Sequence, residues 1–454
     1  MPPLFWRRFP RRHFLFVSPV FSLQARPGVR ILKRHALALH FHPVVIPVPW
    51  ADSLAGRAVM SDKDAGLSAE QRATIERAAA RAVRRSQYPE DMGFMPYSGR
   101  FTNADVTLRT PWLSEYFKFR NRNPLADHET LRDVQRQIGA DCSEIIDRFR
   151  GAMLGLAIGD ALGTTLEFSP RDRATVTDIV GGGPFHLKPG DWTDDTSMAC
   201  CLAYSLVHSH RFDPDQVMLA FSYWYRFGAY SPTGECFDIG GTTRAALDRY
   251  LKTGNAFSGD TDPNSAGNGS LMRLAPVVLF HASDFEKAVH FAAESSRLTH
   301  GAQEAVDACR FFAALMWGAL AGFPKEEILS ARFSPLPGYW DKNPIAPAVA
   351  RIASGSYKHK TRDEISSSGY VIDTLEAALW AFYSNGDFES GVLAAVNLAG
   401  DADTVGAVFG QLAGACYGET RIPARWIVNT HAAHGFYHFA EDLLATSRMS
   451  QPEN

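Results

Sequence analysis

Apolar residues recur at helical spacing along most of the chain from Arg148 to about Ala445. Runs that alternate apolar and polar residues, which would indicate half-buried strands, are nearly absent there. The pattern therefore predicts an all-α fold in which one helical segment follows another. The expected helices span Gly151–Leu162, Asp195–His208, Pro214–Phe227, Gly241–Leu251, Leu271–Phe280, Asp284–Ser295, Gln303–Ala321, Ala346–Ser354, Val371–Ser384, Phe388–Leu398 and Thr404–Gly418.

Several of these segments are rich in alanine and glycine and carry apolar residues on more than one face. Helices of this kind suit a large domain in which neighbouring helices cover them on all sides. We therefore expect one large multi-helix domain over residues 146–445, followed by a short tail over residues 446–454.

Residues 60–145 precede this domain and have a different pattern. Ser68 and Gln71 fit a capping box, which predicts the start of a charged helix that runs to about Arg85. Eight aromatic residues then follow between Tyr88 and Phe119, among prolines and glycines. Two interpretations remain open. The segment is a strap packed on its own domain, or it is an arm that binds another protein, since aromatic residues and arginines are frequent interface anchors.

Residues 1–59 carry nine Lys or Arg and a single acid, Asp52. The 454-residue chain has a formal charge of −3, so residues 60–454 carry −11. The segment sustains no helical period. We expect a disordered extension or a misplaced gene start, with the native chain beginning near Met60, and the alternatives are a targeting sequence and a basic arm.

Composition narrows the class of function. With 46% hydrophobic and 21% charged residues, the chain has the profile of an ordinary globular protein, which excludes a nucleic-acid-binding or disordered chain as a whole. No stretch offers eighteen uncharged apolar residues, so no membrane span is expected. The six cysteines are scattered and form no C-x-x-C pair, which is typical of reduced thiols in a cytoplasmic protein.

A first string of hard oxygen atoms stands at the entrance of an expected helix, in Asp191-Trp-Thr-Asp-Asp-Thr196. Asp and Thr are common N-cap residues, because their side chains accept from the free amides of the first turn. One cap explains only one of Thr193, Asp194 and Asp195, so this group indicates more than a helix start.

A second string, Gly400-Asp-Ala-Asp-Thr404, opens another helix about 200 residues later. Asp401, Asp403 and Thr404 repeat the arrangement of carboxylates and a hydroxyl. Together the strings offer four carboxylates, which would repel one another without cations. Oxygen ligands with no nearby His or Cys favour Mg²⁺ or Mn²⁺ over Zn²⁺, so the sequence predicts a site for two such ions.

At this point the chain resembles a known family, the ADP-ribosylglycohydrolases, which include the bacterial dinitrogenase-reductase-activating glycohydrolases. The resemblance covers about residues 149–435 and rests on six pieces in family order. They are Gly151–Gly163 with Glu167-Phe168, Trp192–Thr196, Asp238–Thr242, Gly267–Arg273, Thr299-His300 and Gly400–Thr404.

The resemblance implies an all-α ADP-ribosylglycohydrolase-like domain with an N-terminal extension, and a role for each matching residue. The ligands of two Mg²⁺ or Mn²⁺ ions would be Thr193, Asp194, Asp195, Asp401, Asp403 and Thr404. The implied catalytic residues are Glu167, Asp194 and Asp403, with Glu167 positioning or activating water. The implied substrate-binding residues are Gly267, Asn268 and Gly269, whose amides would face the diphosphate, and Asp238 and His300, which would line the distal ribose and the nucleotide.

The substrate implied by the resemblance is an ADP-ribosylated protein. The string Leu166–Arg171 resembles the arginine-specific bacterial branch more than the serine-specific branch, which favours ADP-ribosyl-arginine. Family members with similar N-terminal extensions serve as immunity proteins against ADP-ribosyltransferase toxins, so residues 60–140 suggest such a toxin as partner. The alternatives are a stoichiometric binding protein that occludes a toxin through residues 60–140, and a hydrolase of another ADP-ribose linkage.

Three further groups favour structural roles. Asp160 lies inside an apolar stretch, where an unpaired carboxylate is costly, so we expect it to cap or hydrogen-bond nearby and not to bind metal. The spacing of His431, His434 and His438 resembles a metal cluster but is more typical of one helix face. Gly181–Gly183 is expected to be a loop and not a phosphate-binding turn.

Overall fold

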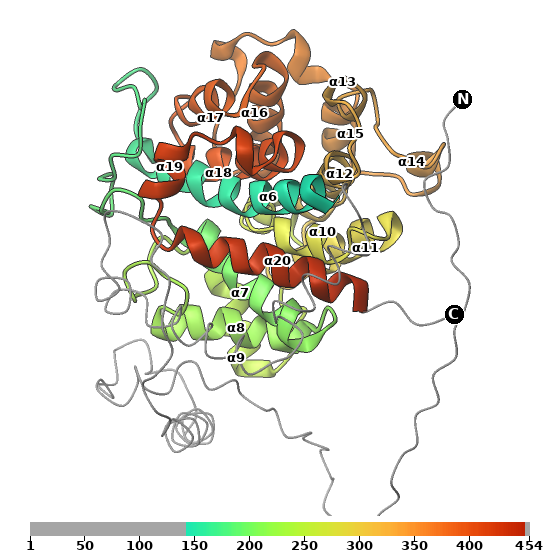
Figure 1. Cartoon of the computed structure of the whole chain (residues 1–454). Coiled ribbons are helices and arrows are strands. Elements are labelled where there is room, and N and C mark those ends of the chain that lie inside the picture. The colour runs from blue at the N-terminus through green and yellow to red at the C-terminus, as the bar shows by residue number, and fades with distance from the viewer. Residues whose placement is uncertain (1–141, 450–454) are drawn as a thin grey trace, which may run out of the picture. The chain divides into compact units, whose positions relative to one another are not determined.

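The structure is a computed structural model that describes residues 142–449. The all-α prediction is confirmed, because this part of the chain forms helices and has no strand beyond four isolated single-residue bridges (Figure 1). The longer helices are α6 (Cys142–Gly163), α7 (Asp194–Ser209), α8 (Pro214–Phe227), α9 (Gly241–Thr253), α11 (Phe285–Arg297), α12 (Gln303–Leu320), α16 (Val371–Ser384), α17 (Phe388–Val396), α18 (Ala402–Tyr417) and α20 (Ala433–Met449).

Shorter elements connect them. They are α10 (Ala275–Phe280), α13 (Lys325–Ile328), α14 (Tyr339–Lys342), α15 (Pro347–Ala353) and α19 (Ala424–Asn429), with 3₁₀ turns η5 (Thr164–Leu166), η6 (Pro263–Ser265), η7 (Ser356–His359), η8 (Arg362–Glu364) and η9 (Glu419–Arg421). The segments expected over residues 1–59 and 60–145 lie outside the described residues, except that residues 142–145 belong to the first turn of α6.

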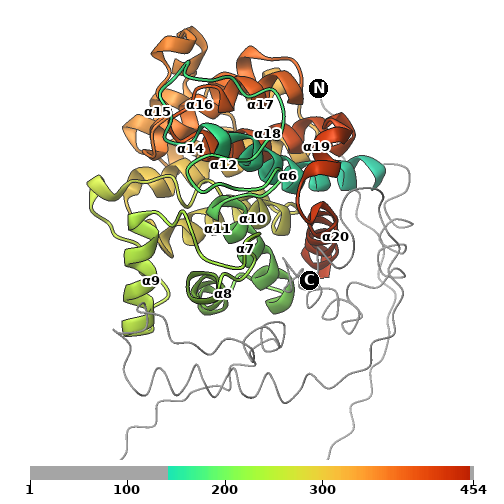
Figure 2. The same cartoon turned by 90° about the vertical axis from the view of Figure 1, so that its left-hand side faces the viewer.

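Helices α6 and α18 run antiparallel in direct backbone contact at the centre of the domain (Figures 1 and 2). Glycines spaced by four residues share one face of each helix. A Cβ atom on these glycines would overlap the opposite backbone, in the pairs Gly151 with Gly414, Gly155 with Gly410, and Gly159 with Gly406. Only glycine allows this approach, so the seam fixes how the end of α6 meets the start of α18.

The remaining helices cover this pair on different sides. Helices α16 and α17 pack against α18, whereas α20 lies along α6, and α7 contacts α8, α10 and α20 (Figure 2). Residues 151–163 of α6 and nearly all of α18 are buried. This explains why their sequences carry small and apolar residues on every face.

Helix boundaries agree with the sequence prediction for α8 and α16, and differ at α10. The sequence predicts a helix from Leu271, but α10 begins at Ala275 because Pro276 occupies its first turn. The preceding residues form a turn in which the amide of Leu271 donates to the carbonyl of Asn268 at 2.8 Å. Helix α20 continues through Met449, four residues past the expected end of the domain at residue 445.

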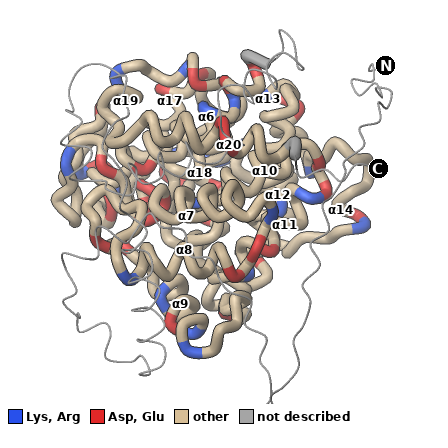
Figure 3. Tube along the Cα trace, turned by 60° about the horizontal axis from the view of Figure 1, so that its bottom comes forward, with Lys and Arg blue, Asp and Glu red and all other residues tan. Residues whose placement is uncertain are grey.

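Lys and Arg positions are interspersed with Asp and Glu positions along the described chain (Figure 3). No helix within them is long and apolar enough to cross a membrane. Five free thiols are described, at Cys200, Cys201, Cys236, Cys309 and Cys416.

Candidate functional site

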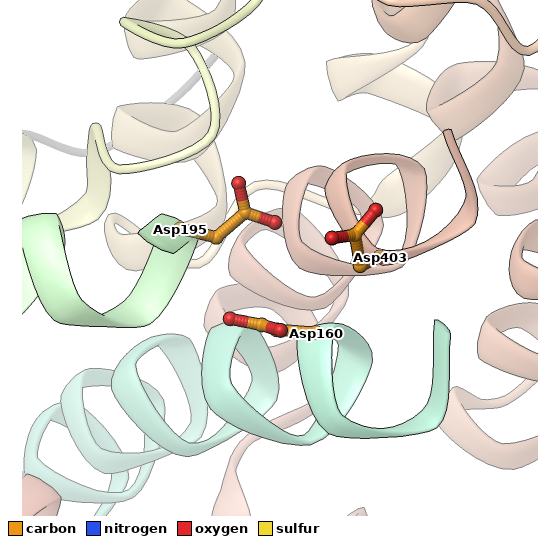
Figure 4. Close-up of side chains that lie close together, drawn as sticks. All are labelled: Asp160, Asp195 and Asp403. Atoms are coloured by element: carbon orange, nitrogen blue, oxygen red, sulfur yellow. The ribbon is translucent and has the colours of Figure 1, made fainter. Parts of the chain in front are cut away.

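Three helix ends meet at one end of the glycine seam. Gly163, the last residue of α6, lies against the backbone of Ala402 and Asp403 in the first turn of α18. Asp160 of α6, Asp195 of α7 and Asp403 of α18 direct their carboxylates toward one another (Figure 4). Oxygen atoms of these three side chains lie within 4.8 Å of one another. Two strings about 200 residues apart thus form one cluster.

Asp160 is fully buried and caps α7 from α6. Its Oδ1 accepts from the backbone N (2.9 Å) and Oγ1 (3.0 Å) of Thr193, and its Oδ2 accepts from N (3.1 Å) and Oγ1 (2.6 Å) of Thr196. Thr193, the N-cap residue of α7, makes no side-chain cap of its own. A carboxylate has about four acceptor sites, so Thr193 and Thr196 supply the local hydrogen-bond partners expected for Asp160. Asp160 also lies close to Asp195 and Asp403, and its exclusion from the metal ligands stays a prediction.

Two threonine hydroxyls connect α7 with α18. Thr404 Oγ1 donates to Asp195 Oδ1 at 3.2 Å, and Thr193 Oγ1 lies 3.2 Å from Asp403 Oδ2. Because Thr193 Oγ1 also lies 3.0 Å from Asp160, its single hydrogen serves one carboxylate at a time. All of these side chains are buried. The hydroxyls therefore hold Asp195 and Asp403 in place across the helix junction.

Glu167 comes from the segment after η5. The amide of Phe168 donates to the carbonyl of Gly400 at 2.7 Å, and the amide of Gly400 donates to the carbonyl of Ser169 at 3.1 Å. These bonds fix the Glu167 segment to the loop that enters α18. Carboxylate oxygens of Glu167, Asp238 and Asp403 lie within 4.8 Å of one another.

Asp238 lies beside Glu167, next to the acidic cluster. The structure places it among the carboxylates, and its expected role near the distal ribose and the nucleotide stays a prediction. Its φ of 57° is uncommon for a residue other than glycine. The strained backbone directs the side chain toward Glu167, and strain of this kind is frequent at functional sites.

Burial and mutual repulsion favour the neutral forms of these carboxyl groups. Burial, with the nearby charge and hydrogen bond of Asp238, raises the pKa of Glu167 to about 10. Burial also raises the pKa of Asp238 to about 7. The pKa values of Asp194, Asp195 and Asp403 lie well above their ordinary range, first because of burial and then because of neighbouring carboxylates. The cluster requires protons or cations to balance its charge.

Three buried carboxylate oxygens have no hydrogen-bond partner among the described residues. They are Glu167 Oε2, Asp195 Oδ2 and Asp403 Oδ1. A buried polar atom without a partner is costly, so natural proteins rarely keep one without a reason. Three such oxygens in one cluster indicate a place for a cationic ligand. Their chemistry suits a hard divalent cation.

Asp401 is held in place by the turn around Asn268. Asn268 Nδ2 donates to Asp401 Oδ2 at 2.7 Å and lies 2.9 Å from Thr374 Oγ1. A Cβ on Gly369 would lie 3.2 Å from Asp401 Oδ2, so this loop passes close to the carboxylate. Asn268, implied by the resemblance as a diphosphate contact, therefore uses its side chain to position Asp401.

The turn at Gly267–Gly269 lies against the ring of His300. A Cβ on Gly267 would lie 3.4 Å from His300 Nε2, and a Cβ on Gly269 would lie 2.8 Å from its Cε1. The amides of Gly267 and Asn268 already donate to the carbonyls of Ser265 and Gly369. Of the three amides expected to face a diphosphate, only that of Gly269 has no backbone acceptor within the described residues.

The structure brings the expected site residues into two neighbouring groups. The acidic group contains Thr193, Asp194, Asp195, Asp401, Asp403, Thr404, Glu167 and Asp238. The turn group contains Gly267, Asn268, Gly269 and His300, and Asn268 connects the two groups. Asp194 is buried, and the other carboxylates raise its pKa, but it belongs to neither set of closest carboxylates. The proposed roles of these residues remain predictions.

Sequence reasoning missed the parts played by Thr196, Arg273 and Thr299. Thr196 binds Asp160, and the fully buried Arg273 donates to Gly269 O and Thr299 Oγ1. All three stand in the quoted strings. A charged or hydroxyl residue within a quoted string was the available signal, but the sequence does not show its partner.

The histidines and glycines for which the sequence favours structural roles lie outside the acidic group and the turn group. His431 is in the turn before α20, with its ring 5.4 Å from that of Trp192, so it does not share the helix face expected for it. His434 and His438 do lie on α20. Gly181–Gly183 form a turn in which Gly181 O accepts from Thr165 Oγ1 at 2.9 Å.

The chain is similar in sequence to known proteins. A sequence model of the family described as ADP-ribosylglycohydrolase matches residues 141–453. The chain is 47% identical over 300 residues to the ADP-ribosylarginine hydrolase Tri1 of Pseudomonas putida (strain GB-1), covering 66% of this chain and 78% of that protein. It is 45% identical over 301 residues to the ADP-ribosylarginine hydrolase Tri1 of Serratia proteamaculans (strain 568), covering 66% and 80%.

A solved structure has the same fold. The structure titled "ADP-ribosylglycohydrolase-related protein complex" aligns with a TM-score of 0.59 and 43% sequence identity, and the alignment covers 68% of this chain and all of that one. The similarity of fold and of sequence therefore extends over the helical domain.

Proposed function

The chain belongs to the ADP-ribosylglycohydrolase family, and from this premise we propose that it removes ADP-ribose from modified arginine side chains of proteins. Its enzyme class is that of the ADP-ribosylglycohydrolases. The arginine linkage is supported by the two relatives named ADP-ribosylarginine hydrolase, at 47% and 45% identity. The single observation that carries the proposal is the cluster of buried carboxylates at the junction of α6, α7 and α18.

The residues of the cluster fit divalent cations. Glu167, Asp195 and Asp403 each keep one buried oxygen without a partner among the described residues. Mg²⁺ and Mn²⁺ prefer carboxylate and hydroxyl oxygens of this kind. We assign two such ions to the six residues Thr193, Asp194, Asp195, Asp401, Asp403 and Thr404. When bound, the ions supply Lewis acidity and neutralise the carboxylates.

The reaction breaks the bond between the anomeric carbon of ADP-ribose and a guanidinium nitrogen of arginine. Positive charge builds on the sugar as this bond lengthens, and the oxygen of a water forms the new bond to the same carbon. Glu167 accepts a proton from that water and passes it to the departing arginine nitrogen, which returns Glu167 to its ionised form. Asp238 shares a hydrogen bond with Glu167, so it influences which of the two holds the proton.

Glu167 must be ionised to act as a base. Burial raises its pKa to about 10 in the protein alone, which favours the protonated form. Positive charge brought into the cluster lowers that pKa, because it stabilises the carboxylate. The residue is therefore prepared to accept a proton only when the carboxylates around it are neutralised.

A protein acceptor agrees with the surface beside Glu167. Phe168 is 68% exposed and has a φ of 55°, which is rare for a bulky residue. Arg171 holds the same segment in place, because its guanidinium donates hydrogen bonds to the carbonyl oxygens of Leu398, Arg362 and Ile365. A rigid, exposed aromatic ring next to the reacting group is suited to contact a protein side chain.

The direct test compares substrates and variants. Purified enzyme is incubated with a protein carrying labelled ADP-ribosyl-arginine or ADP-ribosyl-serine, with and without Mg²⁺ or Mn²⁺. We expect release of ADP-ribose from the arginine linkage only, and only with metal. Asp403→Ala and Asp194→Ala should lose both turnover and bound metal measured by elemental analysis. Asp363→Ala, which changes an exposed carboxylate, is the matched control. Full activity in Asp403→Ala would overturn the assignment.

A second activity, as an immunity protein against an ADP-ribosyltransferase toxin, is supported by the aromatic-rich segment over residues 60–140, which lies outside the described residues. If that segment occludes a toxin, the double variant Asp194→Ala/Asp403→Ala still neutralises it at equal molar amounts. Deletion of residues 60–140 then removes this protection and leaves hydrolysis intact. Loss of protection in the double variant would leave hydrolysis as the whole activity.

A further inference from the structure

Arg273 is a buried cation in the wall of the turn group. It is fully inaccessible to solvent and makes no ion pair with a carboxylate of the described residues. Its guanidinium donates to Gly269 O and to Thr299 Oγ1, each at 2.7 Å, and lies 4.5 Å from the centre of the Phe221 ring. Burying an arginine is costly, so the burial of Arg273 at this position requires an explanation.

The direction of the hydrogen bond between Arg273 and Thr299 determines the direction of the one between Thr299 and His300. A guanidinium only donates, so Thr299 Oγ1 is an acceptor toward Arg273. The same hydroxyl lies 2.8 Å from His300 Nδ1, and Thr299 is fully buried. No other acceptor for its hydrogen is present among the described residues. If Nδ1 carried a hydrogen, the hydroxyl hydrogen would have no partner, which is unfavourable inside a protein.

His300 Nδ1 is therefore an acceptor. The ring is also neutral, because burial and the charge of Arg273 lower the pKa of His300 to about 3. A neutral imidazole has one hydrogen, so that hydrogen is on Nε2.

The Nε2 edge lies at the glycine turn. A Cβ on Gly269 would lie 3.1 Å from Nε2, and one on Gly267 would lie 3.4 Å from it, so both positions leave that edge without a covering side chain. Arg273 also holds the carbonyl of Gly269, which fixes the turn itself. One guanidinium thus sets the geometry of both partners.

We propose that Arg273, acting through Thr299, fixes His300 as an Nε2–H donor that binds an acceptor oxygen of the ADP-ribosyl group. Arg273 and Thr299 are positioning residues and do not contact the substrate. The identity of the ligand rests on the proposed function, whereas the hydrogen position is a property of the protein alone.

The hydrogen position is tested in the protein without substrate. Nitrogen NMR of the full chain labelled in its histidines distinguishes protonated from unprotonated ring nitrogens. The chain has 15 histidines, and His300→Gln identifies the signal of interest. We expect His300 to be the Nε2–H form in the wild-type protein and in Thr299→Ser, and to lose this preference in Thr299→Val, which lacks the hydroxyl. An Nδ1–H signal in the wild-type protein, or an unchanged signal in Thr299→Val, would overturn the proposal.

Binding supplies the second readout. We expect Thr299→Val to weaken ADP-ribose binding about tenfold by calorimetry, or ~1.4 kcal/mol, with kcat nearly unchanged, and Thr299→Ser to bind as the wild type does. Equal affinity in Thr299→Val would overturn the substrate role. If the wild-type protein binds no ADP-ribose while the NMR result is as expected, the positioning of His300 stands and the proposed function fails.

Discussion

The two sides of the site are built in opposite ways. On the acidic side, carboxylates from three helix ends are buried together, and three of their oxygens have no partner among the described residues. On the turn side, Arg273, Thr299 and His300 form a continuous chain of hydrogen bonds. The acidic side is incomplete without cations, whereas the turn side is already ordered in the protein alone.

This difference indicates which interactions stabilise each side of the site. Repulsion among the carboxylates opposes folding until positive charge arrives, so cation binding and folding are linked there. The turn side holds no cluster of carboxylates, and Arg273, Thr299 and His300 are joined by hydrogen bonds within this chain, although Arg273 Nε is buried without a partner among the described residues. Changes on the two sides should therefore be separable by their dependence on metal.

The largest effect is expected from Glu167→Gln. The amide has nearly the same shape but accepts no proton, so kcat should fall by roughly 10²–10⁴-fold. Metal content should stay at the wild-type level, because Glu167 is not among the assigned ligands. Steady-state kinetics with elemental analysis measures both, and Glu389→Gln on α17 is the control. Unchanged kcat would remove Glu167 from the reaction.

The glycine seam between α6 and α18, which brings the three helix ends together, should tolerate no added side-chain atom. A Cβ in Gly410→Ala would overlap the backbone of Gly155, so we expect a loss of about 3 kcal/mol in the free energy of unfolding. Gly386→Ala is the matched control, because a Cβ there meets no atom within 4 Å. Denaturant unfolding of both variants gives the comparison. Equal stability would show that α6 and α18 separate easily.

Metal should stabilise the protein in a pH-dependent way. Burial raises the pKa of Asp238 from 3.8 to about 7 and that of Asp160 to about 6, so the folded protein holds protons that the unfolded chain releases above pH 3.8. Without metal, stability should therefore fall as pH rises from about 4 to about 7, and the pKa of about 10 for Glu167 extends the fall to higher pH.

Saturating Mg²⁺ at 100 times its Kd should restore about 2.7 kcal/mol. Thermal unfolding at pH 5 and pH 8, with Mg²⁺ or with a chelator, measures this. The cation should stabilise more at pH 8 than at pH 5, because fewer of the carboxyl groups then hold protons that it must displace. A Tm indifferent to Mg²⁺ at both values would contradict the view that the acidic side is incomplete.

Asp160→Asn tests whether Asp160, which lies close to Asp195 and Asp403, is a metal ligand. An amide cannot accept all four hydrogen bonds from Thr193 and Thr196, so we expect about 2 kcal/mol lower stability. The variant should still bind two ions per chain, as judged by elemental analysis. Loss of one ion with little change in stability would instead make Asp160 a ligand.

The smallest effect belongs to the turn side. A Cβ in Gly269→Ala would lie 2.8 Å from His300 Cε1, which displaces the ring. We expect ADP-ribose binding about tenfold weaker, with metal content and the Mg²⁺-dependent Tm shift unchanged. In the control variant Gly240→Ala the new Cβ meets nothing within 4 Å, so this variant should bind ADP-ribose as the wild type does. A change in metal content in Gly269→Ala would show that the two sides are not separable.

Much of this protein follows from local pattern. Helical periodicity predicts the all-α class, and the bounds of α8 and α16 agree with it. The pairing of the string around Asp194 with the string around Asp403 indicates one acidic site, because hard oxygens in both strings begin helices. These features depend on residues close together in the chain.

Tertiary structure decided the contacts between distant residues. The spacing of glycines is visible in the sequence, but only the antiparallel fit of Gly155 on Gly410 shows why Asp160 reaches α7 and why Asp195 meets Asp403. Likewise, Asp238 lies with Glu167, and Arg273 orders His300 through Thr299, in ways that no spacing reveals. The chain by itself determined which groups are available and which helices carry them. Packing decided their partners, because hydrogen bonds and charge repulsion act over a few ångströms, whereas these residues are separated by tens to hundreds of positions.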